Sequence, residues 1–427
     1  MKDTTSNKES LLRPATLCVH GGYDPVDHRH SVARPLYQSS AYSYDSASAA
    51  AALFSGETEG NIYSRLGTPT TDEAETRVSL LEGGIAAVAF SSGMAAASGF
   101  FLNFLSAGDV IASSSHLYGG SMGLFSDTLP RLGIETRFFD PLDSKSLEAI
   151  MDSRIKVIMA ENLANPSLSV PDHEGIVKIA RAWQVPYLVD NTLATPLSSR
   201  PFDYGADFIL HSTTKYMSGH GDAIGGMIVD SGRFTFTHDR YPLMYDSAPN
   251  GKPYVEAFGE RAFSTRLRMK TLMNLGGCMA PFNAWLLLRG LESLHVRYER
   301  HLSNALFLAS ELSRDSRIAW VNHPSLEDHP SHANAIRYLG GHFGAMIGFA
   351  PVGGYPAAER FINRVTLLTH TTNIGDVKTL VIHPASTTHR NMDTEARSRV
   401  GIGDDFIRMS VGIEDSEDLL HAIHEAL

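Results

Sequence analysis

The sequence predicts an α/β fold, with a mostly parallel sheet in a large domain and a smaller α+β domain at the C-terminus. Short apolar runs alternate with segments of helical length through the first half of the chain, which favours parallel strands covered by helices on both faces. The length of 427 residues exceeds that of one typical domain. From residue 318 onward, short strands and helices return and end in an expected helix over 416–427.

The expected elements of the large domain follow from these apolar runs. The expected strands are 86–90, 110–114, 136–139, 157–160, 187–189, 208–210 and 227–229. The expected helices are 94–105, 122–129, 144–151 and 175–183. Residues 231–277 show no clear period and predict an irregular insertion, whereas 281–311 predicts one long helix or two. We therefore expect an N-terminal arm (1–64), a large domain (65–294) and a C-terminal domain (295–427).

Composition excludes several classes of protein. Lys plus Arg is 36 and Asp plus Glu is 47, and the net charge of −11 argues against nucleic-acid and membrane partners. Two distant cysteines, Cys18 and Cys278, exclude a disulfide framework and a cysteine zinc site, and favour a reducing, cytoplasmic location. The uncharged stretch 83–108 contains several Gly and Ser residues, which favours a buried strand, turn and helix over a membrane span. The first ten residues are polar and contain no apolar stretch, so no secretory signal is expected there.

Polar residues follow four of the predicted strands, where ligands of parallel sheets bind. Gly93 precedes a predicted helix, so backbone N–H groups there can approach an anion, although a tight turn alone would look the same. Asp190 ends an apolar strand, as a cap residue or as the partner of a buried cation. Lys215 comes directly after three hydroxyl residues at another strand end, and a desolvated Lys can bond covalently to a carbonyl.

Together these clusters describe a site for pyridoxal 5'-phosphate (PLP). This cofactor needs a Lys for its aldehyde, an Asp for its pyridinium nitrogen and hydrogen-bond donors for its phosphate. Lys215, Asp190 and the hydroxyls of Ser212 and Thr214 meet these needs. Tyr118, after the strand 110–114, offers an aromatic face to the ring. Neither a Gly-x-Gly-x-x-Gly fingerprint nor a Walker A loop is present at 91–95.

The order of these motifs resembles the Cys/Met-metabolism family of PLP enzymes over nearly the whole chain. The matching motifs are Val19-His20-Gly21-Gly22, Tyr63-Ser64-Arg65, Leu81-Glu82-Gly83-Gly84, Ser92-Gly93-Met94, Tyr118-Gly119-Gly120, Asn165-Pro166, Asp190-Asn191-Thr192, Ser212-Thr213-Thr214-Lys215, Gly219-His220-Gly221 and the run 408–415. The resemblance implies the type I PLP-dependent transferase fold. It also implies a homo-oligomer, a dimer or a dimer of dimers, with shared active sites.

The resemblance assigns a role to each motif. Lys215 would bond to the cofactor and move protons, Asp190 would pair with the pyridinium, and Tyr118 would stack on the ring and take part in catalysis. Asn165 would contact the ring hydroxyl, and Arg408 would bind the substrate carboxylate with Asn373 beside it. Tyr63 and Arg65 would reach the phosphate of a neighbouring subunit, and Tyr63 also the substrate. The remaining cofactor contacts would come from Gly93, Met94, Thr192, Ser212 and Thr214.

Within the family, several features resemble the O-acetylhomoserine sulfhydrylases. They are the insertion at 231–277, the motif 373–376, the run 380–389 and Gly120 in place of the Cys of methionine γ-lyases. The expected reaction is γ-replacement on an O-activated homoserine by sulfide or a small thiol. Three alternatives remain: a γ-lyase in which water completes the reaction, γ-replacement with a non-standard nucleophile, and a catalytically silent scaffold subunit. Intact Lys215, Asp190 and Arg408 argue against the last.

Departures from the family pattern lie near the expected substrate pocket. They are Thr68 before Pro69, Ser121 after the Tyr-Gly-Gly motif, and the run 161–164 before Asn165. No metal is expected, since the spacing of His323, His329 and His332, in an expected surface loop, fits no zinc pattern. His383 and His389 flank a turn, and a structural or pocket-lining role is expected for them.

Overall fold

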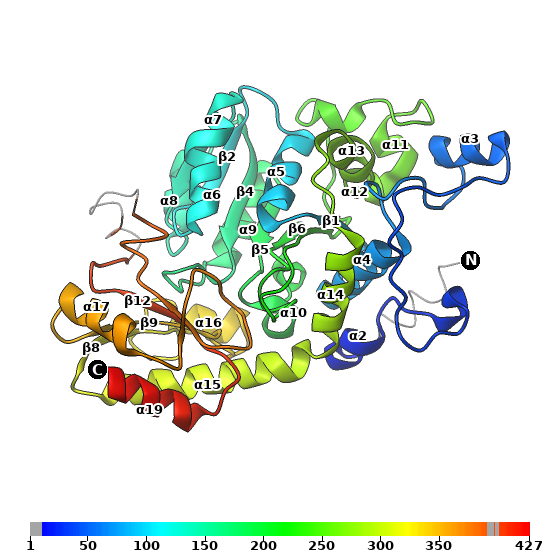
Figure 1. Ribbon diagram of the computed structural model, residues 1–427. Coiled ribbons are helices and arrows are strands. Elements are labelled where there is room, and N and C mark those ends of the chain that lie inside the picture. The colour runs from blue at the N-terminus through cyan, green and yellow to red at the C-terminus, as the bar shows by residue number, and fades with distance from the viewer. Residues whose placement is uncertain (1–10, 391–396, 398–400) are drawn as a thin grey trace.

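A computed structural model describes residues 11–390, 397 and 401–427. The large domain contains a seven-stranded sheet in the order β1-β7-β6-β5-β4-β2-β3, with helices on both faces (Figure 1). Its strands are β1 (Ala86–Phe90), β2 (Val110–Ser114), β3 (Glu135–Phe139), β4 (Ile155–Glu161), β5 (Tyr187–Asp190), β6 (Phe208–His211) and β7 (Gly226–Asp230). All seven predicted strands are present, with bounds that differ by two residues or fewer.

The helices of the large domain and of the arm follow the alternation read from the sequence. They are α2 (Pro14–His20), α3 (Ala47–Ser55), α4 (Pro69–Glu82), α5 (Gly93–Phe104), α6 (Gly119–Gly123), α7 (Leu129–Arg131), α8 (Ser144–Ile150), α9 (His173–Trp183) and α10 (Thr195–Ser198). A π-helical turn, Leu124–Thr128, joins α6 to α7, so the predicted helix 122–129 is one part of a longer helical segment. Short 3₁₀ turns lie at Pro25–His28 and Pro201–Tyr204.

β7 is the antiparallel member of the mostly parallel sheet that the sequence predicts. β7 pairs antiparallel with both β6 and β1, whereas the pairs among β6, β5, β4, β2 and β3 are parallel. The physical reason is the connection between β6 and β7, residues 212–225. It contains turns in place of a crossover helix, and without such a helix the chain returns in the opposite direction.

The insertion 231–277 is more regular than its sequence suggested. It contains α11 (Tyr254–Phe258), α12 (Ala262–Arg266), α13 (Met273–Leu275), 3₁₀ turns at Pro242–Tyr245 and Gly259–Arg261, and a π-helical turn at Leu267–Leu272. Phe263 of α12 packs on Phe208 of β6 and on Phe100 of α5, with ring centroids 4.2 Å and 5.3 Å apart. The insertion is therefore part of the core, and its short helices were hidden because each is too short to show a period.

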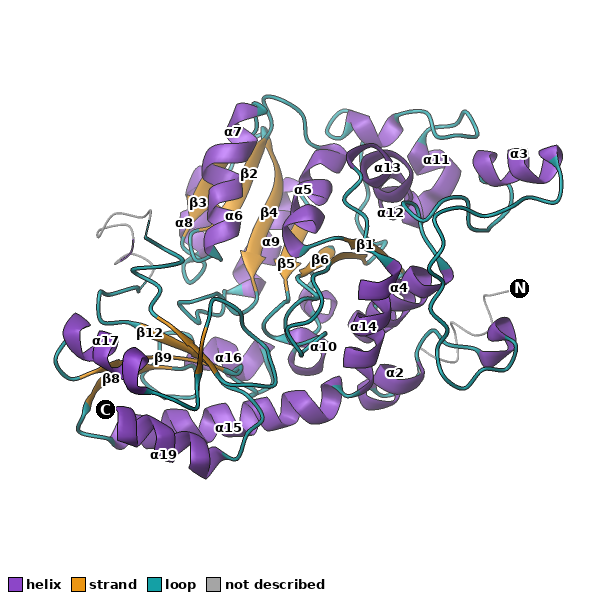
Figure 2. Ribbon diagram, viewed as in Figure 1, coloured by secondary structure: helices purple, strands orange, loops and turns teal. Residues whose placement is uncertain are grey.

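The C-terminal part has a second sheet, in the order β10-β11-β12-β9-β8. Its strands are β8 (Ile318–Asn322), β9 (Met346–Pro351), β10 (Thr369–His370), β11 (Leu380–Ile382) and β12 (Ile407–Ser410). The helices are α14 (Pro281–Glu292), α15 (Leu294–Arg314), α16 (His332–Tyr338), α17 (Tyr355–Arg364) and α19 (Ser416–Ala426). Residues 281–311 thus form two helices that meet at Ser293. The carboxyl end of β4 points toward this second sheet (Figure 2).

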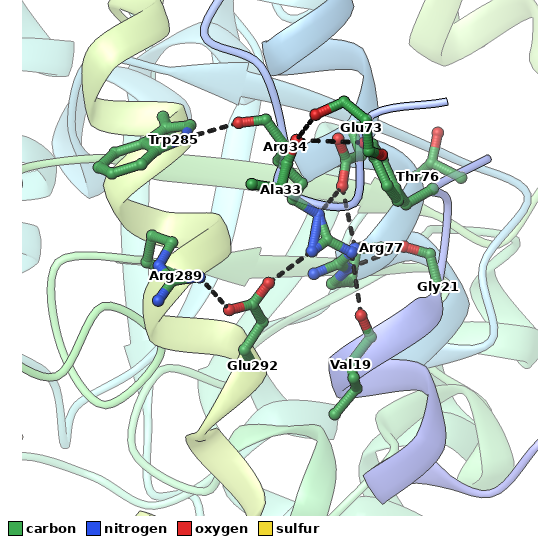
Figure 3. Close-up of polar contacts among 12 residues, drawn as sticks. Val19, Gly21, Ala33, Arg34, Glu73, Thr76, Arg77, Trp285, Arg289 and Glu292 are labelled. Carbon is green, nitrogen blue, oxygen red and sulfur yellow. Dashed lines mark hydrogen bonds and ion pairs between the residues drawn. The ribbon is translucent and has the colours of Figure 1, made fainter. Parts of the chain in front are cut away.

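A buried ion network fixes the base of the N-terminal arm (Figure 3). Glu73 of α4 pairs with Arg34 of the arm and with Arg77, whose Nη2 lies 3.0 Å from Glu73 Oε1. Arg34 also reaches Glu292 of α14 at 2.6 Å and donates to the Val19 carbonyl at 2.9 Å. Three segments that are distant in sequence are thereby held together. Within the described residues, no helix combines the length and apolarity needed to span a membrane.

Candidate active site

Lys215 lies in the turn that follows β6, at the edge of the sheet that faces the C-terminal part of the chain. Its Nζ donates a hydrogen bond of 3.0 Å to Asn373 Oδ1. Burial, helped by the nearby charge of Arg408, lowers the pKa of Lys215 to about 8. A larger fraction of this amine is therefore neutral near pH 7 than for an ordinary lysine, which makes it a nucleophile for a carbonyl.

Asp190 stands at the end of β5 and is partly buried. Burial raises the pKa of Asp190, while hydrogen bonds from Thr192 and the nearby His211 oppose that rise. The Thr192 amide donates to Asp190 Oδ1 at 3.0 Å, which fixes the carboxylate at the strand end. A carboxylate held in this way favours a cation beside it.

Hydroxyl groups and the N-terminus of α5 form a polar cradle near Asp190. Thr192 Oγ1 accepts a 2.8 Å hydrogen bond from the Ser212 amide, and Thr214 Oγ1 accepts one of 3.0 Å from Gly225 N. Gly93 begins the 12-residue helix α5, and a Cβ there would lie 2.8 Å from Ser212 Cβ. Only Gly lets the helix N-terminus approach Ser212 so closely, with Met94 next along the helix. The cradle suits an anion such as a phosphate.

Arg408, at the centre of the second sheet, joins the two parts of the site. Its Nη2 donates to the Thr372 carbonyl at 2.9 Å and to the Asn373 carbonyl at 3.2 Å, and its Nη1 donates to Asn165 Oδ1 at 3.2 Å. Its buried Nε has no partner among the described residues. Burial lowers the pKa of Arg408 to about 10. A buried guanidinium with a spare donor is suited to bind a carboxylate.

Tyr118 and Asn165 are linked through Glu161, a residue to which the sequence analysis gave no role. The Tyr118 and Asn165 amides donate to Glu161 Oε1 and Oε2 at 2.5 Å and 3.0 Å. The ring of Tyr118 is 45% exposed and lies over Gly120, where any Cβ would collide with it. In the sequence, Glu161 was recognisable as a polar residue at the end of an apolar run and as part of the run 161–164 that departs from the family pattern.

Tyr63 and Arg65 lie apart from this cluster. Tyr63 is 44% exposed, and Arg65 lies over the Tyr63 ring, with its Cζ 5.4 Å from the ring centroid. Arg65 also donates to the Met273 carbonyl at 2.9 Å. Among the described residues of the chain, no hydrogen bond or ion pair joins either side chain to Lys215, Asp190 or Arg408.

The sequence profile described as "Cys/Met metabolism PLP-dependent enzyme" matches residues 15–427. The chain belongs to this family. The predicted family, its PLP dependence and the assignment as an enzyme are thereby confirmed.

Named relatives and a solved structure agree with this assignment. The chain is 43% identical over 410 residues to "Sulfhydrylase FUB7" of Fusarium oxysporum f. sp. lycopersici, which covers 95% of each chain. It is 42% identical to "O-acetyl-L-homoserine sulfhydrylase 1" of Thermus thermophilus, covering 97% of this chain and 100% of the relative. A crystal structure of a putative O-acetylhomoserine (thiol)-lyase from Campylobacter jejuni is 38% identical, covers 97% and 99% of the chains, and superposes with a TM-score of 0.94. The predicted fold class is confirmed.

The described residues fit PLP, the cofactor of this family. The cradle at Gly93 and Ser212 leaves no room for a side chain and presents amides and hydroxyls, as a phosphate requires. Lys215 offers an amine with a lowered pKa, and the Campylobacter structure carries N'-pyridoxyl-lysine-5'-monophosphate at its position 205. Asp190 supplies the carboxylate and Tyr118 an exposed aromatic face. Each group that the cofactor needs is therefore available at one edge of the sheet.

The histidines outside this cluster differ partly from expectation. His323 was expected in a surface loop but is fully buried, where its Nε2 lies 3.3 Å from the Gly344 carbonyl oxygen. The loop between β8 and α16 folds back over it, which the Pro-rich sequence did not reveal. His383 is bonded at 2.7 Å to the Asp404 carbonyl, and His389 lies against Gly119. Among the described residues, no group of three His, Cys, Asp or Glu residues could hold a metal ion.

Proposed function

We propose that the protein catalyses γ-replacement on O-acetyl-L-homoserine, with sulfide or a small thiol as nucleophile, to give homocysteine or methionine. The observation that carries this proposal is the meeting of Lys215 and Arg408 at Asn373. Asn373 accepts from the Lys215 amine through its side chain and from Arg408 through its backbone. A proton-carrying amine thus stands beside a group suited to a substrate carboxylate. The names of the relatives support O-acetylhomoserine as the substrate.

The residues of the site divide the chemistry among them. PLP, when bound, supplies an aldehyde for the substrate amine and a ring that accepts electrons from Cα. Arg408 binds the α-carboxylate and orients the substrate. Lys215, whose pKa lies near 8, takes the proton from Cα and moves protons at Cβ. Acetate leaves from Cγ, and the sulfur nucleophile forms the new bond at the same carbon.

The position of Tyr118 favours γ-replacement by a sulfur nucleophile over the γ-lyase reaction that water completes. Its ring lies over Gly120, and the Cβ of a Cys at position 120 would collide with the ring in that position. We propose that the ring, held there, narrows the path to the reacting carbon, so that a sulfur nucleophile competes successfully with water. A γ-lyase, in which water completes the reaction and α-ketobutyrate forms, is the alternative. Reaction with a non-standard nucleophile differs only in the last step.

Product analysis with the PLP-loaded enzyme tests this function. O-acetylhomoserine is supplied with and without sulfide, and homocysteine and α-ketobutyrate are quantified. We expect homocysteine to form much faster with sulfide than α-ketobutyrate forms without it, and methionine to be a poor lyase substrate. Equal α-ketobutyrate in both reactions would assign the protein to the γ-lyases. A series of other thiols in place of sulfide identifies the preferred nucleophile.

We also propose that the protein is a homo-oligomer in which the arm of one subunit completes the site of another. The arm carries several large exposed apolar side chains, among them Val26, Val32, Phe54 and Tyr63, which are 66%, 93%, 57% and 44% exposed. We infer that these side chains belong to a surface that a partner subunit covers. The dimer or tetramer and the cytoplasmic location stay predictions; the free Cys18 and Cys278 support the latter.

A further inference from the structure

Glu161 occupies a position at which one carboxylate joins three parts of the site. It is the last residue of β4, and its register partner on β5 is Asp190. Its side chain is buried, and the residue is only 5% exposed. Each of its two oxygens accepts a hydrogen bond from a backbone amide, Tyr118 N at 2.5 Å and Asn165 N at 3.0 Å. Tyr118 and Asn165 come from different loops, and Glu161 binds the backbone amides of both.

Opposing influences act on the pKa of the Glu161 carboxyl group. Burial and the neighbouring carboxylate of Asp190 raise the pKa of Glu161 to about 8, while the two amides oppose that rise. His211 faces Asp190 from β6 and is itself bonded at 2.5 Å to Glu82, another buried carboxylate. The positive group joined to this network is Arg408, whose Nη1 donates to Asn165 Oδ1 at 3.2 Å. The two strand-end carboxylates therefore form one unit, in which removal of either charge changes the proton affinity of the other.

We propose that Glu161 is a positioning residue that fixes the Tyr118 and Asn165 loops and, when it is ionised, adds to the negative charge of Asp190 beside the cofactor ring. The amides of both loops bind its oxygens, so its loss frees the ring-facing tyrosine and the asparagine together. Because the pKa of Glu161 is about 8, its charge develops above that pH, where it adds to the charge of Asp190 and favours a protonated cofactor. This inference rests on the PLP site and does not depend on which amino acid or nucleophile reacts.

The test compares Glu161→Gln with a matched control by absorbance of the bound cofactor as a function of pH. Glu161→Gln keeps the size and one acceptor oxygen but removes the charge. We expect the pH midpoint of the cofactor's absorbance change to fall by about one unit, because the negative charge that Glu161 carries above its pKa of about 8 is lost. We also expect PLP to bind about tenfold more weakly, because one loop amide loses its acceptor. No substrate is needed, so the outcome is independent of the proposed reaction.

Asp230→Asn is the matched control. Asp230 is also a buried carboxylate at a strand end and accepts from the Gly232 amide at 2.8 Å, but it lies at the opposite edge of the same sheet. The pH midpoint of cofactor absorbance in the Asp230→Asn protein should equal that of the wild type. A Glu161→Gln protein whose midpoint and PLP affinity both match the control would overturn the proposal.

A second variant, Glu161→Asp, separates charge from geometry and serves if Glu161→Gln does not fold. It keeps the negative charge but cannot span both amides with its shorter side chain. The proposal predicts a midpoint close to that of the wild type together with weaker PLP binding. A midpoint as low as that of Glu161→Gln, or PLP binding as tight as in the wild type, would contradict it.

Discussion

The strand-end cluster and the N-terminal arm reach their positions by different means. Lys215, Asn373 and Arg408 are joined to one another by hydrogen bonds of 2.9–3.2 Å within one chain, either directly or through shared partners. Tyr63 and Arg65, where the arm joins the large domain, are exposed; their side chains contact each other, and Arg65 donates to the Met273 carbonyl. One chain thus builds most of the site but leaves two of its expected residues unused.

The arm itself has both a part that is fixed by buried ion pairs and a part that is exposed. Its base is locked by Arg34, whose side chain is 6% exposed and is paired with Glu73 and Glu292. Other side chains of the arm, including Val32 and Phe54, are exposed. An arm with a fixed base and exposed side chains is suited to present residues to a second subunit. The cluster is fixed by the folding of one chain, whereas we propose that a second subunit completes the arm.

Replacing Lys215 tests the cluster and should have the largest effect. We expect Lys215→Ala to reduce the rate of homocysteine formation on the order of 10³-fold or more, because the amine both holds the cofactor and carries protons. Borohydride reduction followed by mass spectrometry should find the pyridoxyl group on Lys215 of the wild type and at no equivalent position in the variant. Lys178→Ala, which changes an exposed lysine of α9, should keep the wild-type rate. A variant that retains activity would remove Lys215 from its proposed role.

Removing Glu73 tests the base of the arm. Glu73→Gln leaves the buried guanidinium groups of Arg34 and Arg77 without their shared carboxylate, whose side chain is 6% exposed. We expect a loss of about 3 kcal/mol in the free energy of unfolding, measured in urea at fixed protein concentration. Glu292→Gln changes the more exposed end of the same network, 26% exposed, and should cost about 1 kcal/mol or less. Equal losses for both variants would show that Glu73 does not fix the arm.

Sequence reasoning located the strands and the cluster because both depend on local patterns. Lys215 and Asp190 each follow a short apolar run, and parallel strands bring their carboxyl ends to one edge. Which strand runs antiparallel could not be predicted, because the direction of β7 depends on the absence of a helix between residues 212 and 225, which apolar periodicity does not reveal. The burial of His323 was missed because it depends on contacts with the distant Gly344.

Glu161 was missed for a different reason. Its importance comes from two backbone amides at residues 118 and 165 and from a register partner on another strand. Backbone donors leave no mark in an amino-acid sequence, so only the folded geometry can reveal what they bind. The Arg34 network was hidden in the same way, since its partners lie 39 and 258 residues along the chain.

Mixing two inactive variants tests most directly whether the arm of one subunit completes the strand-end cluster of another. Lys215→Ala and Arg65→Ala subunits are mixed under conditions in which exchange is verified by mass. The account predicts that each variant alone is impaired and that the mixture recovers up to about one quarter of the wild-type rate, because half of randomly mixed dimers are hybrids with one intact site. Verified exchange with no recovery of activity would show that each subunit builds its site alone and would contradict the account.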